Sequence, residues 1–402
     1  MELLEDDLLE AARELLPGVV ELRRDLHRHP ELGLELPRTQ AAVLDALDGL
    51  GLEVTTGDAL GSVVADLEGG RPGPRILLRG DMDALPMPED TGLEFASEVE
   101  GAMHACGHDA HTAMLVGAAR LLAARREELP GSVRFMFQPG EEGDGGAELM
   151  IAEGVLEDVD GAFAIHIAPN VPPGIVAWKP GPAMASADVI SIEVVGRGGH
   201  ASTPHWATDP VPVACEMVLA LQSMITRTVD AFDPAVLTIG KIRAGTTDNV
   251  IPERAVLTGT LRAVSETTRA AVQERVRRVA EGIAVAHDCT AEVTVFPGYP
   301  VTVNDRDFAA FVARVADERL GAGRTFEMSA PVMGAEDFSY VLQQVPGAMV
   351  FLGVCPPDNP DPFSAPACHS NRMVLHEDVM ADGIALHAAV ATTFLANGGK
   401  YT

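Results

Sequence analysis

This chain has few lysines, and none of its cysteines lies close to another in the sequence. Its five cysteines stand far apart, at positions 106, 215, 289, 355 and 368 of 402 residues, and lysine occurs only at 179, 241 and 400. A dispersed, odd set of cysteines argues against a disulfide framework and fits reduced thiols in an intracellular enzyme. We therefore expect Cys215 and Cys289 to be small buried hydrophobic residues.

Basic charge and long apolar runs are scarce as well. Against 59 acidic residues there are 29 lysines and arginines, which gives a formal net charge of -30. Such a charge repels nucleic acids and anionic membrane surfaces. No apolar run approaches the roughly 18 residues that a membrane span requires, and the acidic, helical start differs from a signal peptide. We expect a cytoplasmic protein that binds neither nucleic acid nor membrane.

The order of elements predicts an α/β fold with two domains. The pattern is helical from Leu3 to Leu50, with breaks at Pro17 and Pro30, and strands and helices then alternate. One such helix is expected from about Asp109 to Glu128, and the closing helix around Met380 to Asn397. This rhythm predicts a mainly parallel sheet with helices on both faces. We assign it to a discontinuous domain of residues 1–183 and 300–402.

The pattern changes near Pro180. Alternating strands are expected at 189–195, 236–242, 255–263 and 290–296, and helices at 211–229 and 266–287. The resulting order, β-α-β-β-α-β, is that of the ferredoxin-like unit. We therefore predict an inserted satellite domain over residues 184–299.

Four apolar runs are followed closely by side chains that bind metal ions. The runs cover 76–78, 133–137, 163–165 and 349–354, and the residues beyond them are Asp81, Asp83, Glu141, Glu142, His166, Cys368 and His369. In open α/β sheets the ligand crevice lies beyond the carboxyl ends of the strands. Cys106 and His108, two residues apart in an extended segment ahead of a helix, face the same side. We predict one metal-bearing active site that unites these groups.

The adjacent carboxylates Glu141 and Glu142 are the most specific part of this pattern. They would repel each other in a low-dielectric crevice unless a cation absorbed one charge. Because neighbouring side chains diverge, one glutamate can bind metal while the other moves the proton of an attacking water. Asp81 and Asp83 share one strand face, and we expect them to orient the histidine ligands.

At this point the chain resembles the M20 metallopeptidases, and within them the amidohydrolases that include hippurate hydrolases, N-acyl-amino-acid amidohydrolases and auxin-conjugate hydrolases. The likeness runs from Leu22 to His369. Its motifs are GDMDALP at 80–86, CGHDAH at 106–111, QPGEE at 138–142, GRGGHAS at 196–202, NVIP at 249–252 and GAEDF at 334–338.

The resemblance implies a role for each site residue. Two divalent metal ions, zinc or manganese with cobalt or nickel as further options, would be bridged by Cys106 and held by His108, Glu142, His166 and His369. Glu141 would be the general base. His200 of the inserted domain would stabilise the oxyanion, in this family typically in a partner subunit, which implies a homodimer or higher oligomer. Asn249 and Arg262 would hold the substrate carboxylate.

We predict a metallo-amidohydrolase that cleaves the amide bond of small N-acyl-amino acids, hippurate-like or N-acetylated. The nearest alternatives are a dipeptidase or aminopeptidase and a deacetylase of a biosynthetic intermediate. A thiol hydrolase with Cys106 activated by His108 leaves the other ligands unexplained. A non-catalytic metal- or peptide-binding protein would lack the base, but Glu141 is present. For His27 and His29, an amphipathic surface helix is a sufficient explanation.

Overall fold

The computed structural model describes residues 8–359 and 361–401, which form two compact units. The first unit contains the residues up to Ala183, Val303–Ala330 and the residues from Asp337 onwards; the second contains Met184–Thr302 and Pro331–Glu336. The insertion was expected at 184–299 only. Pro331–Glu336 belongs with it because the Ala185 N–H donates to Val332 O (2.9 Å). The connecting segments pair as strands β7 (Gly181–Met184) and β14 (Thr302–Asn304).

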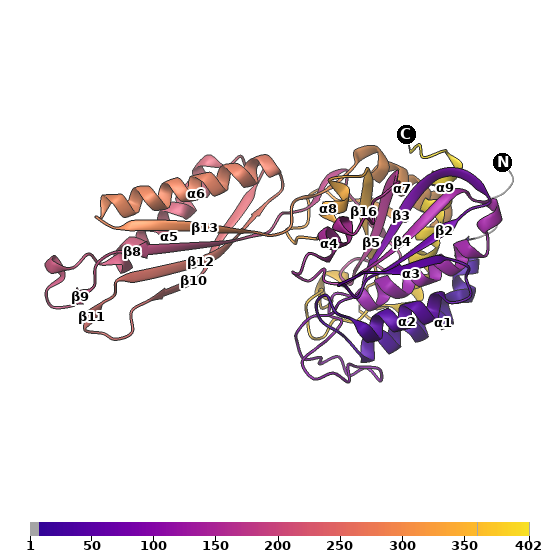
Figure 1. Ribbon diagram of the computed structural model, residues 1–402, viewed down its shortest axis with the longest axis horizontal. Coiled ribbons are helices and arrows are strands. Elements are labelled where there is room, and N and C mark those ends of the chain that lie inside the picture. Colours follow the sequence, from indigo (N-terminus) through magenta and orange to yellow (C-terminus); the bar gives the residue numbers. More distant parts are fainter. Residues whose placement is uncertain (1–7, 360, 402) are drawn as a thin grey trace. The chain divides into compact units, whose positions relative to one another are not determined.

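An eight-stranded sheet forms the centre of the first unit (Figure 1). Its strands, in spatial order, are β1 (Glu53–Thr56), β2 (Val63–Glu68), β4 (Pro130–Gln138), β3 (Arg71–Asp81), β5 (Gly161–Ala168), β16 (Gly347–Gly353), β6 (Val176–Trp178) and β15 (Thr325–Glu327). The four central strands β4, β3, β5 and β16 run parallel. Antiparallel pairs flank them, since β1–β2, β2–β4 and β16–β6 are antiparallel. The sheet is therefore mixed, with a parallel centre.

Long helices cover one face of this sheet. They are α1 (Leu8–Arg28), α2 (Pro37–Leu47), α3 (His108–Ala123), α7 (Arg306–Leu320) and α9 (Met380–Ala396), with the 3₁₀ turns η1 (Arg126–Glu128) and η4 (Glu377–Val379) near their ends. Gly80 of β3 allows close approach to α3, because a Cβ there would lie 3.0 Å from His111 O. Neighbouring residues of a strand face opposite sides, and Arg79 lies over Phe338 at the start of α8 (Ser339–Leu342). The short helices α8 and α4 (Gly146–Ala152) thus lie on the other face (Figure 1).

Two expectations for the helices need correction. Pro17 lies inside α1 and does not break it; the buried stripe of α1, which includes Ala12, Val19 and Leu26, packs on α3 and α9 and offsets the missing hydrogen bond. The expected first residues of that helix, 3–7, lie outside the described part. The helical stretch Glu377–Ala396 is long and apolar enough for a membrane span, but 89% of the tested window is buried inside the unit. It is a core helix.

The second unit consists of a four-stranded antiparallel sheet and two helices. The strands are β8 (Asp188–Val195), β10 (Ala235–Ala244), β12 (Arg254–Ala263) and β13 (Thr290–Pro297), in the spatial order β10-β12-β8-β13. Helices α5 (Pro210–Thr228) and α6 (Glu266–Ala286) follow β8 and β12. Asp209 and Ser265 cap their first turns by accepting the N–H groups of Val211 and Thr268. Buried residues alternate along β8 and β12, as expected for a sheet covered on one face.

Beyond one end of this sheet lie the short paired strands β9 (Gly199–His200) and β11 (Val250–Ile251), followed by the turn η2 (Pro204–Trp206). Cys215 is exposed, contrary to expectation, because it lies outside the buried stripe of α5 formed by Val213, Ala214 and Met217. Cys289 is buried, as expected. In the first unit a last 3₁₀ turn, η3, covers Pro362–Ser364.

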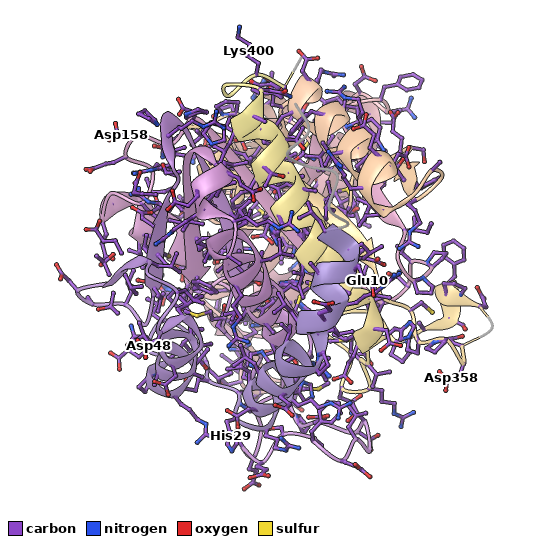
Figure 2. The ribbon with its side chains drawn as sticks, turned by 90° about the vertical axis from the view of Figure 1, so that its right-hand side faces the viewer. Glu10, His29, Asp48, Asp158, Asp358 and Lys400 are labelled. Carbon is purple, nitrogen blue, oxygen red and sulfur yellow. The ribbon has the colours of Figure 1, made fainter. Side chains whose placement is uncertain are left out.

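Acidic side chains lie at several separate places on the surface of the first unit. Figure 2 shows Asp48, Asp158 and Asp358 near the edge of the view, and these residues, like Glu10, are exposed. This arrangement keeps the charges hydrated and spread out, which lowers their mutual repulsion.

Candidate metal centre

The carboxyl ends of the parallel central strands bring the expected ligands to one edge of the large sheet. Asp81 ends β3, Glu141 and Glu142 follow β4, His166 lies within β5, and Cys368 and His369 come after β16. Cys106 and His108 lie at the start of α3, which packs on β3, β4 and β5. The convergence follows from the parallel pairing, because all these strands leave the sheet on the same side.

The five expected ligands come together in overlapping groups. Ligand atoms lie within 4.8 Å of one another in the set Cys106, His108 and His166, and also in the set Cys106, Glu142 and His369. Cys106 Sγ is 3.5 Å from His166 Nε2, and His369 Nε2 is 3.1 Å from Glu142 Oε1. Cys106 belongs to both groups and therefore occupies the shared position.

Backbone contacts fix the orientation of two imidazole rings. His108 Nδ1 lies 2.8 Å from Asp83 O, and His166 Nδ1 lies 2.7 Å from Ile167 O. A carbonyl can only accept, so each Nδ1 carries the proton and each Nε2 of the neutral ring keeps a lone pair. His108 Nε2 is buried and has no hydrogen-bond partner among residues 8–359 and 361–401. A bound cation would satisfy it, so the residues present fit a divalent metal.

The carboxylate of Asp83 holds the glutamate pair in place. Its Oδ1 accepts the N–H of Glu141 and its Oδ2 accepts the N–H of Glu142, both at 2.9 Å. The turn before them needs Gly140, whose φ is +70° and whose Cβ would lie 2.4 Å from Leu34 Cδ2. One carboxylate thus holds both peptide groups, and the side chains of Glu141 and Glu142 come within 4.8 Å of each other and of His108.

The charges of the centre show that it is built for cations. Burial, the largest single effect, would lower the pKa of His108, but the carboxylates of Asp81, Asp83 and Glu142 outweigh it and raise that pKa well above its usual value. Burial would likewise raise the pKa of Glu142, yet His369 and His108 lower it. The hydrogen bond to Glu142 raises the pKa of His369. The carboxylates of the centre thus favour positive charge among them.

Cys368 had only weak support as a site residue from the sequence. Its side chain interacts with that of Cys106. The hydrogen bond between the two thiols, followed by burial and by the charge of Glu142, raises the pKa of Cys106 well above its usual value. The same hydrogen bond lowers the pKa of Cys368 to about 6, with the charges of His166 and His369 acting in the same direction. A cation at Cys106 would displace its proton. The only signal in the sequence was the adjacency of Cys368 to His369.

Asp81 and Asp83 were expected to orient the ligand histidines, and the histidine in direct contact with Asp81 is His111, which is outside the expected ligand set. Asp81 Oδ1 contacts His111 Nδ1 at 2.5 Å, while His108 Nε2 is 3.5 Å from Asp81 Oδ2. His111 Nε2 in turn accepts the N–H of Ile167 (2.8 Å), so this ring links α3 to β5. Asp83 holds His108 through its backbone carbonyl and the glutamates through its carboxylate.

A buried hydrogen-bond network that the sequence did not reveal holds the carboxylate of Asp81 in place. Arg79 Nη1 donates to Asp81 Oδ2 (2.7 Å), and its Nη2 donates to Asp337 Oδ1 (3.1 Å). Asp337 also accepts from Gln138 Nε2 at 2.8 Å. All four side chains are buried at 1% exposure or less. Arg79 and one polar residue from each of the motifs at 80–86, 138–142 and 334–338 thus brace the end of β3.

His27 is wholly buried, which corrects its expected place on a surface helix. Its Nδ1 lies 2.8 Å from Asp109 Oδ2 and its Nε2 lies 3.2 Å from Glu89 Oε1. Burial, the largest effect, lowers the pKa of His27, but these carboxylates outweigh it and raise the pKa above its usual value. His29 is partly exposed and contacts Asp25 O.

The inserted unit places two of its three expected site residues together. His200 and Asn249 are exposed and adjoin each other, since Ala201 N–H donates to Asn249 O (3.1 Å) and β9 pairs with β11. His200 Nδ1 accepts the N–H of Ser202 (3.1 Å), which leaves the proton of a neutral ring on Nε2. Arg262 lies near the opposite end of β12, opposite Val236 of β10. Within one inserted unit it does not share a site with His200.

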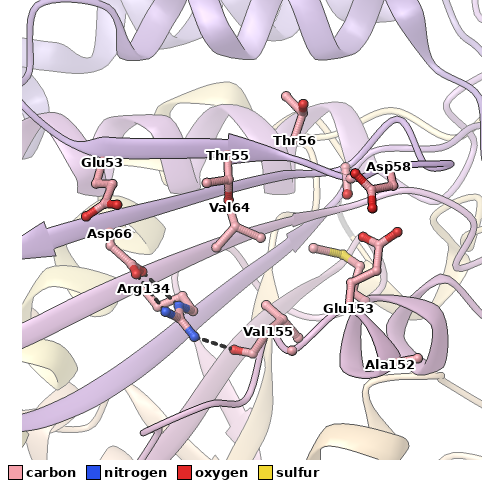
Figure 3. A pocket seen from close by; sticks show the side chains of 14 residues that line it. Glu53, Thr55, Thr56, Asp58, Val64, Asp66, Arg134, Ala152, Glu153 and Val155 are labelled. Carbon is pink, nitrogen blue, oxygen red and sulfur yellow. Dashed lines mark hydrogen bonds and ion pairs between the residues drawn. The ribbon is translucent and has the colours of Figure 1, made fainter.

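A cavity elsewhere in the first unit contains none of the expected ligands. It is lined by β1, β2, β4 and the end of α4, and its ionisable side chains include Glu53, Asp58, Asp66, Arg134 and Glu153 (Figure 3). The guanidinium of Arg134 already has hydrogen-bond partners in the protein: Nη2 donates to Asp66 Oδ2 (2.6 Å) and Nη1 donates to Val155 O (3.0 Å). The chemistry therefore belongs to the metal centre.

Comparison with known proteins agrees with this geometry. The family described as Peptidase family M20/M25/M40 matches residues 77–393. Thermostable carboxypeptidase 1 of Saccharolobus solfataricus is 39% identical over 95% of this chain and 96% of its own length. The N-acetylcysteine deacetylase of Bacillus subtilis is 41% identical over 83% of this chain and 88% of its own. The crystal structure of the YXEP protein of Bacillus subtilis, a dinuclear metal-binding peptidase from the M20 family, has a TM-score of 0.84 at 35% identity and covers 95% of this chain and 99% of that one.

Proposed function

Because this chain belongs to the peptidase family M20/M25/M40 and is a metallo-amidohydrolase, we propose that it cleaves the amide bond of small N-acyl-amino acids. The carrying observation is the pair of neighbouring carboxylates: Glu142 contacts His369 and shares a ligand group with Cys106 and His369, while Glu141 lies outside that group but within reach of His108 and Glu142. The likeness to an N-acetylcysteine deacetylase supports an N-acyl substrate. We place the enzyme in the cytoplasm.

We assign two divalent cations to the centre, zinc or manganese with cobalt or nickel as alternatives. Cys106 would bridge them, because it belongs to both ligand groups, and the remaining ligands would be His108, Glu142, His166 and His369. Two bound cations supply an acidified water and a polarised amide carbonyl.

Glu141 moves the proton in this proposal. Its side chain is buried at 6% exposure, and Asp83 fixes its backbone N–H. Glu141 takes a proton from the attacking water and later gives it to the departing amine nitrogen, so one carboxylate acts first as base and then as acid. Nothing in this cycle uses the Cys106 thiol as a nucleophile, which separates the proposal from a thiol hydrolase.

The inserted unit acts as a ferredoxin-like satellite domain that completes a site in a homodimer. His200 would donate its Nε2 proton to the oxyanion, and Asn249 and Arg262 would bind the substrate carboxylate. Arg262 lies eight residues along β12 from Arg254, the end nearest β9, which is about 26 Å of strand. One substrate cannot span that length, so Arg262 and the pair His200 and Asn249 of the same inserted unit would not bind the same substrate molecule.

A carboxypeptidase or dipeptidase is the second candidate. The 39% identity to thermostable carboxypeptidase 1 favours it. Both reactions release an amino acid whose carboxylate must be held, so the two candidates differ in the acyl side of the substrate.

The test is a substrate panel on chelator-treated enzyme, reloaded with zinc and manganese in turn. We expect N-acetyl- and N-benzoyl-amino acids to be hydrolysed faster than dipeptides and longer peptides, and only after metal is restored. Faster cleavage of peptides would favour the carboxypeptidase. Full activity of the metal-free protein would contradict the metal centre and favour a thiol hydrolase.

A further inference from the structure

Two thiols meet inside the metal centre. The side chains of Cys106 and Cys368 interact with each other, although one residue precedes α3 and the other follows β16. The backbone fixes this proximity, because His369 N–H donates to Ala105 O (2.8 Å) and so holds the two segments side by side. His369 has a φ of +68°, a conformation that a residue other than glycine adopts only where the surroundings impose it. The contact is therefore part of the built site.

The pair is accessible from one side. Cys106 is 7% exposed and lies 3.5 Å from His166. Cys368 is only partly buried, and its neighbour His369 has 56% of its side chain exposed. Of the two cysteines, Cys368 is therefore the more exposed to a small oxidant and Cys106 the more buried. Both residues are free thiols.

We propose that Cys106 and Cys368 form a reversible disulfide in the metal-free centre, which removes Cys106 from the ligand set. The oxidant is a hydroperoxide. A thiolate sulfur attacks the peroxide, the O–O bond breaks, and a sulfenic acid forms with release of water or an alcohol. The sulfur of the second thiol then attacks the sulfenic sulfur, the S–S bond forms, and hydroxide leaves as water after taking up a proton. Two thiols are oxidised and one peroxide is reduced.

Metal and disulfide exclude each other in this arrangement. A metal ligand must be a thiolate, and a disulfide sulfur carries no such charge. Bound cations consequently protect Cys106, and the disulfide protects it from irreversible oxidation when cations are lost. The inference rests on the same centre as the proposed function, but it concerns the thiols and can be tested without turnover.

The test uses the full chain, stripped of metal with a chelator, desalted and exposed to hydrogen peroxide. Remaining thiols are blocked with N-ethylmaleimide, and the protein is digested without reductant for mass spectrometry. We expect a cross-linked peptide that joins Cys106 to Cys368, disappears after dithiothreitol, and forms much more slowly in zinc-loaded protein. Recovery of the two cysteines as separate maleimide adducts or sulfinic acids would overturn the inference.

Variants give a second, independent measurement. After peroxide, dithiothreitol and reloading, wild type should recover most of its zinc, as measured by plasma mass spectrometry, whereas Cys368→Ser should recover much less because its Cys106 oxidises beyond the reversible stage. Cys215→Ser, which alters an exposed thiol of the inserted unit, is the matched control and should behave as wild type. Equal recovery in Cys368→Ser and wild type would contradict the protective role. A cross-link in a protein without amidase activity would refute the proposed function alone.

Discussion

The two units present ionisable side chains in opposite ways. At the carboxyl edge of the large sheet, Asp81, Asp83, His108 and Glu141 are all buried below 9% exposure. In the inserted unit, His200 and Asn249 are exposed on the short pair β9–β11. Burying a charge is costly unless it is paired. The first unit therefore fixes its ionisable groups through buried partners, whereas the inserted unit presents exposed groups on a short strand pair.

This contrast teaches where each kind of function resides. A buried centre with fixed rings and braced carboxylates can bind metal without rearrangement, because its second contacts already exist. An exposed histidine on a two-residue strand gains a defined environment only when something covers it. We therefore expect substitutions in the first unit to affect catalysis and stability most, and His200 of the inserted unit to act in the site of a second subunit.

The largest effect is expected at the general base. Glu141→Gln keeps the size of the side chain but cannot accept a proton, so kcat should fall at least roughly 10³-fold. Metal content, measured by plasma mass spectrometry, should be unchanged, because the five proposed ligands all remain and the new side chain keeps an oxygen near His108. Glu142→Gln is the matched neighbour and should lower metal content. Near-normal turnover in Glu141→Gln would assign the base elsewhere.

A large loss of stability is expected from the arginine beneath the centre. Arg79→Met leaves Asp81 and Asp337 buried without their cation, which should lower the free energy of unfolding by about 3–5 kcal/mol. Urea denaturation measures it. The matched change in the inserted unit is Arg254→Met, whose partner Glu193 lies at the surface. It should leave the midpoint of that unit unchanged, because exposed ion pairs contribute little. A comparable loss in both variants would contradict the contrast between the units.

His200→Ala should lower kcat by about 10²–10³-fold without changing thermal stability, because an oxyanion donor is lost and an exposed side chain is removed. A mixing experiment then asks which subunit supplies it. If His200 acts in the partner's site, a mixture of Glu141→Gln and His200→Ala protein, exchanged under conditions that allow subunits to redistribute, should regain about a quarter of wild-type activity. Half of the dimers would be mixed, and each would contain one intact site. No recovery would place His200 in its own subunit.

The sequence predicted the buried centre better than the exposed groups for physical reasons. Cysteine, glutamate and histidine are unusual after apolar strands, which marks Cys106, Glu142 and His369 as candidate ligands. Parallel strands end at one edge of a sheet, so these residues could be expected to lie close together. The braces could not be predicted, since Arg79, Gln138 and Asp337 meet only through the register of β3 with β4 and the return of the chain at α8. His27 was wrongly expected at the surface, because an amphipathic pattern does not show that the carboxylates of Asp109 and Glu89 contact its ring.

The sequence also did not predict that several outer strands of the large sheet pair in the antiparallel direction. Short strands such as β1 and β6 have no period long enough to reveal their direction. For the inserted unit, alternation along β8, β10, β12 and β13 predicted the elements well. Its site residues were found only through motif resemblance, since an exposed histidine between glycines has no physical signature in one sequence.

The smallest effect concerns the link between α1 and the segment before α9. Burial, the largest single effect, raises the pKa of Glu377, but hydrogen bonds from Arg24 and Arg23 outweigh it and leave that pKa below 4.5. A lowered folded-state pKa stabilises the fold above the unfolded value and is lost as the pH falls through the folded value. Glu377→Gln should therefore be less stable than wild type by about 1–3 kcal/mol at pH 7. The difference should shrink below pH 4.5, as followed by urea midpoints. A difference that stays the same on acidification would contradict a contribution from the ionised Glu377.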